Sequence, residues 1–243
     1  MSRLRRLRQG ALTAAYSVYY NARDLNYSYG LPTPKSAGGT RFKTYELYSL
    51  HGRDALLREL NGRIQCGDVF YDVGANVGIY SCAAASLGAE VVALEPNPAA
   101  RRKLRKNLDA NGFEATVLPF AASDEDGAET LHVSSYPETT SLNRENATVS
   151  GGSVVERVEV ETRTLDSLLD RLPCPDHVKI DVEGEGDAVL SGSEGMLRRK
   201  EPTVYFEPHP QNGGEKEARK LLEEFGYVVE EVGDGWVCDL KPP

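Results

Sequence analysis

The segment FYDVGANVGIY, residues 70–80, constrains the fold of this chain more than any other. It completes an apolar run, 69–73, that is typical of a buried strand, and it leads into a small-residue segment, 79–88, that favours a helix. Gly74 and Gly78 lie between the two, where glycine permits a tight turn and a close approach of a ligand to the backbone. A strand that passes through such a turn into a helix is a building unit of parallel α/β sheets.

Strand and helix patterns keep alternating along the rest of the chain. We expect helices over residues 54–64, 79–88, 98–112, 164–172, 187–199 and 215–226, and strands over 69–73, 90–96, 115–122, 177–182, 203–208, 227–232 and 235–240. Gly233-Asp234-Gly235 joins the last two strands as a hairpin, so an antiparallel strand ends the sheet. The pattern predicts an α/β fold with a doubly wound, mostly parallel, seven-stranded, Rossmann-like sheet.

Two regions depart from this alternation. Residues 128–135 and 154–165 alternate apolar and polar side chains, as half-exposed strands do, and we expect them to form an inserted β-hairpin with a polar, mobile tip. Residues 1–40 form a basic helical extension that ends in a Pro/Gly/Ser linker over 30–40, so the domain proper is expected over 41–243.

The N-terminal extension has two interpretations. Its arginines and a short apolar run predict a helix that packs on the domain, or a basic amphipathic helix that contacts an anionic membrane through residues 1–20. The apolar run is too short to span a bilayer.

Composition excludes several classes of function. The net charge of −9 argues against nucleic acid as a partner, because an acidic protein repels phosphate backbones. The cysteines are scattered without a CxxC pair or a Cys/His cluster, which predicts neither a zinc site nor a disulfide framework. They are Cys66, Cys82, Cys174 and Cys238. A reducing compartment, and therefore a cytoplasmic location, is expected.

The glycine turn suits one nucleotide-like ligand better than others. A P-loop is excluded because no Lys-Ser/Thr pair follows Gly78. A dinucleotide such as NAD could use Glu95 for its ribose, but Asn76 stands where a middle glycine is needed and Asp72 would repel the pyrophosphate. S-adenosylmethionine carries no phosphate and has a positive sulfonium and ammonium, which Asp72 can stabilise directly or through water.

The neighbouring strand ends fit the rest of that molecule. Glu95 can accept both ribose hydroxyls, and Ala121 and Ala122 leave room for a flat adenine. The structural alternative is that Gly74 and Gly78 only form the turn and that Asp72 caps the helix.

Four segments resemble the FkbM-type methyltransferases, class I S-adenosylmethionine-dependent enzymes that mostly methylate hydroxyls of sugars and polyketides. They are FYDVGANVGIY, TLDSLL (164–169), VKIDVEGEGDAVLSG (178–192) and PTVYFEPH (202–209), and the resemblance covers about residues 41–210. It implies that Asp72, Gly74, Asn76, Gly78 and Glu95 bind the cofactor and that Asp181 lies beside the transferred methyl. With the residues next to them, the expected cofactor set is Asp72, Gly74, Ala75, Asn76, Gly78, Glu95, Asn97, Ala121, Ala122 and Asp181.

The chain departs from the family pattern at one position. The family usually reads Val-Glu-Gly-x-Glu, whereas here Glu185 precedes Gly186 and Asp187 follows it. The acid is displaced, so we expect that side of the pocket to differ.

Acidic residues and one histidine gather at the ends of the later strands. We expect His209 or Asp181 to be the general base for an acceptor hydroxyl, with Glu183 and Glu207 orienting the acceptor. Each of them also has a plain structural interpretation, as a helix cap, a strand-end carboxylate or a loop residue. Their oxygens and imidazole could also hold Mg²⁺ or Mn²⁺, but the sequence assigns no metal ligands.

The sequence therefore predicts an S-adenosylmethionine-dependent O-methyltransferase. The expected acceptor is an oxygen, hydroxyl or carboxylate, of a carbohydrate-like small molecule or glycan precursor. The alternatives are an NAD-dependent oxidoreductase, which the glycine spacing disfavours, and a cofactor-binding module without turnover.

Overall fold

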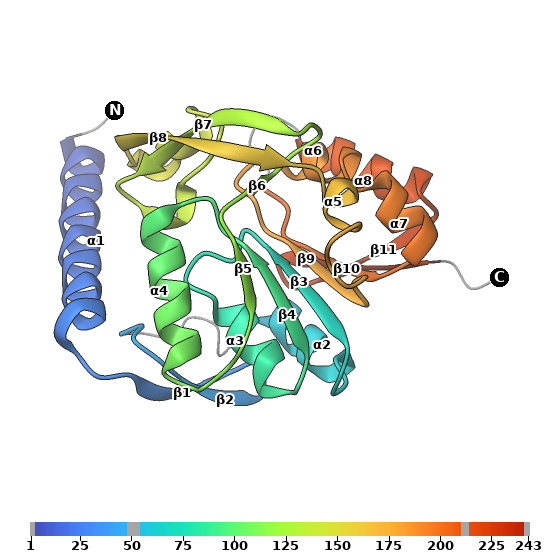
Figure 1. Ribbon diagram of the computed structural model, residues 1–243. Helices are drawn as coiled ribbons and strands as arrows, with labels where there is room; N and C mark the ends of the chain where they lie inside the picture. The colour runs from blue at the N-terminus through green and yellow to red at the C-terminus, as the bar shows by residue number, and fades with distance from the viewer. Residues whose placement is uncertain (1–2, 48–53, 210–213, 241–243) are drawn as a thin grey trace.

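The computed structural model describes residues 3–47, 54–209 and 214–240. A seven-stranded sheet of order β11–β12–β10–β9–β3–β4–β5 forms its centre (Figure 1). The strands are β3 (Val69–Val73), β4 (Glu90–Leu94), β5 (Thr116–Leu118), β9 (His177–Ile180), β10 (Thr203–Phe206), β11 (Tyr227–Val232) and β12 (Gly235–Leu240). The pairs among β3, β4, β5, β9 and β10 are parallel, and β12 is antiparallel to both its neighbours. The predicted fold class is confirmed, and the antiparallel strand lies one place inside the edge.

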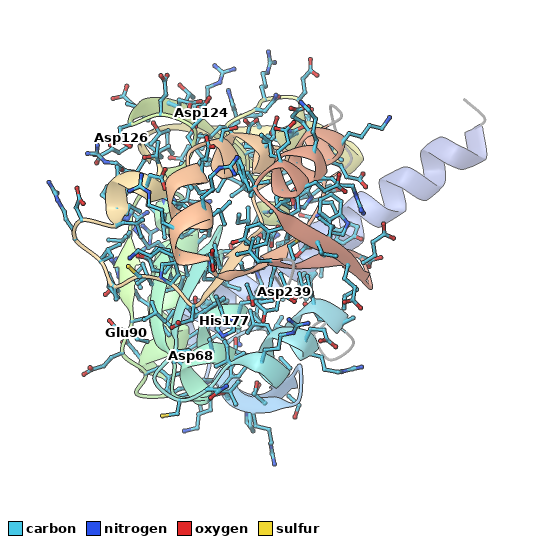
Figure 2. The ribbon with its side chains drawn as sticks, turned by 90° about the vertical axis from the view of Figure 1, so that its right-hand side faces the viewer. Asp68, Glu90, Asp124, Asp126, His177 and Asp239 are labelled. Carbon is cyan, nitrogen blue, oxygen red and sulfur yellow. The ribbon has the colours of Figure 1, made fainter. Side chains whose placement is uncertain are left out.

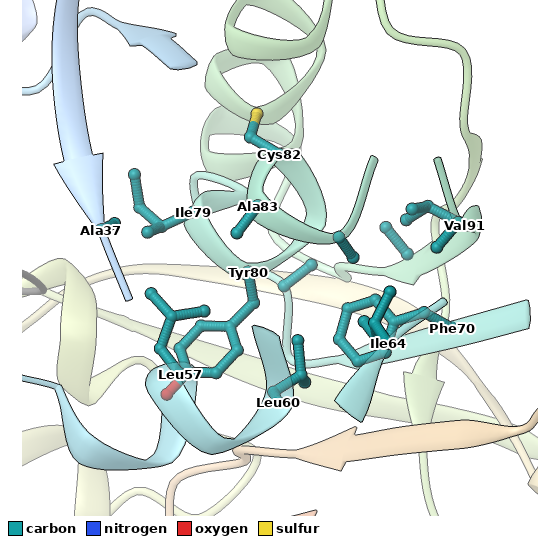
Figure 3. Packing of buried hydrophobic residues seen from close by; sticks show 14 of the residues in the cluster. Ala37, Leu57, Leu60, Ile64, Phe70, Ile79, Tyr80, Cys82, Ala83 and Val91 are labelled. Carbon is teal, nitrogen blue, oxygen red and sulfur yellow. The ribbon is translucent and has the colours of Figure 1, made fainter. Parts of the chain in front are cut away.

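Helices cover both faces of this sheet, which buries alternate residues of each strand on opposite sides. Phe70 of β3 packs with α2 (Ala55–Arg63), α3 (Ile79–Ser86) and α4 (Pro98–Asp109), and Figure 3 shows part of this core around Leu57, Leu60 and Tyr80. Tyr71, the next residue, packs on the other face with α5 (Leu165–Leu168), α6 (Gly186–Ser191), α7 (Glu194–Lys200) and α8 (Gly214–Glu224).

Local signals explain where these helices begin. The Asp54 carboxylate accepts a hydrogen bond from the Leu57 amide at 2.9 Å and caps α2, and Asn97 caps α4 in the same way through the Ala99 amide at 2.9 Å. Helix α3 begins instead after Gly78, whose φ of 80° lies in the left-handed region. A glycine there turns the chain without a side-chain cap.

Two predicted helices are shorter than expected. The segment 187–199 divides at Gly192 into α6 and α7, and a Cβ at Gly192 would lie 2.1 Å from the carbonyl oxygen of Ser123, so only glycine fits this junction. The segment 164–172 forms only the single turn α5, and Pro173 follows it. Asp166 of that turn caps α7 by accepting from the amides of Gly195 and Met196 at 2.8 and 2.6 Å.

The predicted strand 115–122 divides between two sheets. Pro119 has no amide hydrogen to continue a ladder, so β5 ends at Leu118 and β6 (Ala121–Ala122) joins another sheet. In that sheet β6 pairs with β8 (Val154–Arg163), which pairs antiparallel with β7 (Gly127–Ser134). This is the predicted inserted hairpin, and two 3₁₀ turns, Pro137–Thr139 and Asn146–Gly151, lie in its tip.

The N-terminal extension is a helix and a hairpin. Helix α1 (Arg3–Tyr29) stands beside α4 in Figure 1, and β1 (Thr33–Ala37) pairs antiparallel with β2 (Thr40–Thr44). The segment predicted as a linker, 30–40, thus contains β1, whose Ala37 is buried in the same core as Phe42 of β2. Among the described residues, no helix has the length and apolar character needed to cross a membrane.

The two ends of the sheet carry different chemistry. At the amino ends of the parallel strands, His177 Nε2 lies 3.1 Å from Asp68 Oδ2, and Arg63 pairs with Asp239 at 2.6 Å. Figure 2 shows Asp68, His177 and Asp239 together at this end, away from Asp124 and Asp126. The carboxyl ends of the strands face the inserted hairpin and form a cavity.

Candidate active site

A cavity of about 290 Å³ lies at the carboxyl ends of β3, β4, β9 and β10, beneath the inserted hairpin. The chain order reverses between β3 and β9, so the cavity lies at the switch point where α/β sheets bind ligands. Eight of the predicted cofactor residues line it: Gly74, Ala75, Asn76, Glu95, Asn97, Ala121, Ala122 and Asp181. Glu183 and Glu207 line it as well.

The turn after β3 is held by the neighbouring strands. The amides of Gly74 and Ala75 both donate to the carbonyl oxygen of Leu94, at 3.1 and 3.0 Å. Gly74 has a φ of 79°, and a Cβ there would lie 1.9 Å from the carbonyl oxygen of Asp181. Glycine at this position therefore allows the end of β9 to approach the turn, which brings Asp181 to the cavity.

Two residues of the expected cofactor set do not line the cavity: Gly78, and Asp72, for which the sequence suggested a direct or a water-mediated contact. Asp72 is fully buried under the turn, where its Oδ2 accepts from the Ser81 hydroxyl at 2.6 Å and its Oδ1 has no hydrogen-bond partner. Burial raises the pKa of this carboxyl, against the opposing effect of Lys179. A Cβ at Gly78 would lie 2.8 Å from Leu104, so this glycine serves the packing of α3 on α4.

Glu95 is buried at the end of β4, where two backbone groups hold it. Its Oε2 accepts from the Asn76 amide at 2.7 Å and its Oε1 from the Asn97 amide at 2.8 Å. Burial raises the pKa of Glu95 to about 7, although these two amides favour the carboxylate. Each oxygen keeps a second lone pair, so the carboxylate can still accept hydrogen bonds from two hydroxyls of a ligand.

Lys179 is a site residue that the sequence interpretation missed. It lies in β9 two residues before Asp181, so the two side chains share a face, and its Nζ is 2.7 Å from Asp181 Oδ2. Burial opposes its charge, but Asp181, Asp72 and Glu207 raise its pKa above the usual range. The available signal was a lysine between Val178 and Ile180 in the short strand HVKI.

His209 lies behind the carboxylates and not on the wall of the cavity. Its Nε2 is 3.0 Å from Asp181 Oδ1 and its Nδ1 is 3.1 Å from Glu183 Oε2. Burial would lower the pKa of His209, but the hydrogen bond to Asp181 and the two carboxylates outweigh it and raise that pKa. With a carboxylate oxygen close to each ring nitrogen, the imidazole can hold Asp181 and Glu183 in place, and the expectation that His209 or Asp181 is the base stays a prediction.

The two carboxylates bonded to His209 have different acidities. Burial disfavours the charge on Asp181, but Lys179 and His209 outweigh it and hold its pKa well below the usual range. Burial raises the pKa of Glu183 to about 7, with His209 opposing this shift and Asp181 reinforcing it. The negative charge of Asp181, followed by burial, also raises the pKa of Glu207. The ends of β9 and β10 therefore place one firmly ionised carboxylate, Asp181, beside Glu183 and Glu207, which protonate more easily.

The described residues include one group with the spacing of metal ligands. Asp181, Glu207 and His209 each have a candidate ligand atom within 4.8 Å of the others. Lys179 Nζ already supplies a positive charge to Asp181 at 2.7 Å. The geometry thus accounts for the ionised state of Asp181 through Lys179 and His209 alone.

The family departure at Gly186 has a packing explanation. A Cβ at Gly186 would lie 2.4 Å from the ring of Phe206, so a larger residue cannot begin α6 there. Glu185 lines the cavity, whereas Asp187 lies in the first turn of α6 and is not part of the wall. The displaced acid predicted from the sequence is therefore Glu185, whose pKa burial raises to about 7.

The N-terminal helix and the hairpin tip contribute the remaining wall. Arg23 of α1, Glu46 after β2 and Glu138 of the hairpin tip line the cavity, and Arg23 Nη1 donates to Glu138 Oε1 at 3.1 Å. The sequence analysis did not identify these residues, because their proximity depends on contacts between segments 115 residues apart.

The tyrosines of α1 also contact the hairpin. The ring of Tyr136 lies 5.3 Å from that of Tyr16 and 6.1 Å from that of Tyr20, and the Tyr20 hydroxyl donates to Glu138. Part of the aromatic surface of α1 is therefore engaged within the molecule. This arrangement agrees with the interpretation of α1 as a helix packed on the domain.

The sheet order is that of the class I methyltransferase fold. The glycine turn at the switch point and the acid at the end of the next strand agree with this fold. The structure resembles precorrin-6y C5,15-methyltransferase from Geobacter metallireducens, with a TM-score of 0.50 and 19% identity over 81% of this chain and 92% of that one. It also resembles the 16S rRNA N2 G1207 methyltransferase RsmC of T. thermophilus, with a TM-score of 0.53 and 17% identity over 86% of this chain and 50% of that one.

The methyltransferase FkbM domain matches residues 72–229, and the chain belongs to this methyltransferase family. It is 30% identical to the hexuronic acid methyltransferase AglP of Haloferax volcanii over 63% of this chain and 62% of that protein, less than two thirds of its length. It is 27% identical to the 31-O-demethyl-FK506 methyltransferase FkbM of Streptomyces tacrolimicus, over 80% of this chain and 84% of that one. The resemblance inferred from the sequence is confirmed.

Proposed function

We propose that this methyltransferase uses S-adenosylmethionine and transfers the methyl group to an oxygen of a carbohydrate-like acceptor. The observation that carries this proposal is that one cavity joins Glu95 at the end of β4 to Asp181, Glu183 and Glu207 at the ends of β9 and β10. Glu95 is placed to bind the ribose of a nucleoside. The three acids at the ends of β9 and β10 are placed to act on a polar acceptor.

The residues present fit this cofactor. Glu95 retains lone pairs for two ribose hydroxyls, and Ala121 and Ala122 form a small-residue wall where an adenine would lie. The acids of the wall outnumber Arg23 and Lys179, which favours a ligand with a sulfonium and an ammonium group. When bound, S-adenosylmethionine supplies an electrophilic methyl group.

The chain's own residues can manage the proton of an acceptor hydroxyl. Glu183 lines the cavity, and its pKa of about 7 suits a general base near neutral pH. His209 holds Glu183 and Asp181 in position through its two ring nitrogens. We assign Glu183 as the base and His209 as a positioning residue, and Glu207 remains a candidate for orienting the acceptor.

The relatives support an oxygen acceptor of this kind. The AglP protein is a hexuronic acid methyltransferase, and the Streptomyces protein acts on 31-O-demethyl-FK506.

A carboxylate acceptor is the nearest variant, and it needs no base because it is already ionised. Glu183→Gln separates the two: we expect it to lower kcat by about 10²–10⁴-fold for a hydroxyl and to leave a carboxylate acceptor unaffected.

Calorimetry and mass spectrometry test the proposal directly. We expect the purified protein to release or absorb heat on titration with S-adenosylmethionine and to show none with NADH. Incubation with a panel of sugars and glycan precursors should yield a product heavier by one methyl group, together with S-adenosylhomocysteine. Binding of NADH instead would favour the oxidoreductase alternative, and cofactor binding without product from any acceptor would favour the module without turnover.

A cytoplasmic protein that also contacts an anionic membrane through residues 1–20 is a separate hypothesis. Flotation with anionic vesicles tests this hypothesis, with a chain that lacks residues 1–30 as the comparison. Equal flotation of the two chains would contradict membrane contact through this segment.

A further inference from the structure

Arg23 and Glu46 leave a buried donor and a buried acceptor without hydrogen-bond partners at the wall of the cavity. Both side chains are almost entirely buried, with relative exposures of 2% and 8% for the two residues. Arg23 Nε and Glu46 Oε1 have no hydrogen-bond partner, although both residues line the cavity. Buried polar groups in proteins nearly always pair with protein or with water, so these two atoms, which come from different segments at one ligand cavity, are available to a bound polar group or to water.

The other contacts of Arg23 do not satisfy its Nε. Its Nη1 donates to Glu138 Oε1 at 3.1 Å, and its guanidinium lies 4.8 Å from the centre of the Tyr20 ring. Asp24 Oδ1 lies 3.9 Å from Nε, but Asp24 is exposed and pairs with Lys103 at 2.5 Å. These contacts fix the guanidinium in place while Nε keeps no hydrogen-bond partner.

The spacing of the two orphan atoms selects a chemical group. Arg23 Nε and Glu46 Oε1 are 3.9 Å apart, too far for a direct hydrogen bond. One oxygen placed about 2.8 Å from each would bridge them. A ligand hydroxyl or a water that such a hydroxyl replaces can do this, because each accepts from Nε–H and donates to the carboxylate, whereas a carboxylate cannot donate and would be repelled by Glu46 and Glu138.

We propose that Arg23 and Glu46 bind a neutral hydroxyl group of the methyl acceptor, so that helix α1 forms part of an acceptor subsite for polyhydroxylated compounds. This rests on the proposed function, since it assigns the acceptor class for the same cavity. The subsite binds a sugar hydroxyl, and any acidic group of the acceptor lies away from Arg23 and Glu46. Arg23 and Glu46 are specificity residues that do not touch the reacting atoms.

Ligand-observed NMR titrations test the subsite on the full chain loaded with S-adenosylhomocysteine. The probes are the methyl glycosides of glucose, galactose and mannose, with methyl glucuronide as the acidic counterpart. We expect at least one neutral glycoside to bind, and we expect Arg23→Lys and Glu46→Gln each to weaken that binding at least tenfold. Arg23→Lys keeps the charge but loses the Nε donor, and Glu46→Gln keeps the size but loses the charged acceptor.

Asp24→Asn is the matched control, because Asp24 lies equally far from Arg23 Nε but is exposed and outside the cavity wall. It should change glycoside affinity by less than twofold. If Arg23 instead bound a carboxylate, Glu46→Gln would remove a repelling charge and tighten methyl glucuronide. That tightening, unchanged affinity in both variants, or no binding of any neutral glycoside to the wild type would overturn the proposal.

The affinity for S-adenosylhomocysteine separates this failure from a failure of the proposed function. All variants should bind that compound within twofold of the wild type, which also verifies their folding. A wild-type protein that does not bind it defeats the proposed function itself. Normal cofactor binding with any of the overturning glycoside results defeats only the subsite.

Discussion

Glu95 shows at the scale of one residue how a buried acid is made ready for a ligand. Two backbone amides hold its carboxylate at 2.7 and 2.8 Å, so its orientation is fixed before any ligand arrives. Pre-organised groups of this kind lose little entropy on binding. The remaining lone pairs face the cavity wall that Ala121 and Ala122 continue.

We expect Glu95→Gln to weaken S-adenosylmethionine binding by about 10–100-fold, because hydrogen bonds to a charged group contribute about 1.5–3 kcal/mol. The amide also cannot accept from both backbone groups and both ribose hydroxyls. Titration calorimetry measures the change. Glu90→Gln is the control, since Glu90 is exposed at the opposite end of the same strand, and an equal loss in both variants would contradict the assignment.

With Glu183 as the proposed base, we expect Glu183 and His209 to set the pH dependence of activity. A base must be deprotonated, so kcat/KM should rise with pH through about 7, the raised pKa of Glu183. The charge of His209 lowers that pKa, and His209→Asn should therefore move the rise to higher pH. Pre-steady-state or steady-state rates over a pH series measure this.

His177→Asn provides the matched control for this profile. His177 is also paired with an aspartate, Asp68, but it lies at the opposite end of the sheet (Figure 2). Its substitution should leave the midpoint unchanged. A midpoint that does not respond to His209→Asn would remove Glu183 from the role of base.

At the scale of elements, the junction of β3, its turn and the end of β9 positions the site. Gly74→Ala would add strain at a φ of 79° and press a Cβ against the carbonyl of Asp181. We expect a loss of about 2–5 kcal/mol in the free energy of unfolding, measured in urea. Gly112→Ala has a similar φ of 68° with open space around it, so it should cost only about 1–2 kcal/mol.

The elements also show which features the sequence could predict. Glycines, prolines and apolar periodicity act locally, so the strand and helix order and the turn at Gly74 were predictable. Pro119 divides one expected strand between two sheets, an outcome that depends on which neighbour Ala121 meets. The position of Asp72 beneath the turn, and of Arg23 on the cavity wall, follows from packing between distant segments that no local pattern encodes.

For the whole molecule, cofactor binding should appear as added stability, because a ligand that binds only the folded chain shifts the unfolding equilibrium. At a concentration 100 times its Kd, S-adenosylmethionine should contribute about 2.7 kcal/mol. For a chain of this size that raises Tm by about 5–11 °C, at about 2–4 °C per kcal/mol. Differential scanning fluorimetry measures the shift, and NADH at the same concentration should give none.

The internal position of β12 has a consequence for synthesis on the ribosome. One edge of β10 pairs with β12, and Val204 lies opposite Cys238. The ribosome therefore makes β10 some thirty residues before its partner β12. Until β12 arrives, the nascent chain exposes the open edge of an apolar strand, which is prone to pairing with other chains. The interval between the synthesis of β10 and of β12 is therefore when we expect this chain to need chaperone protection.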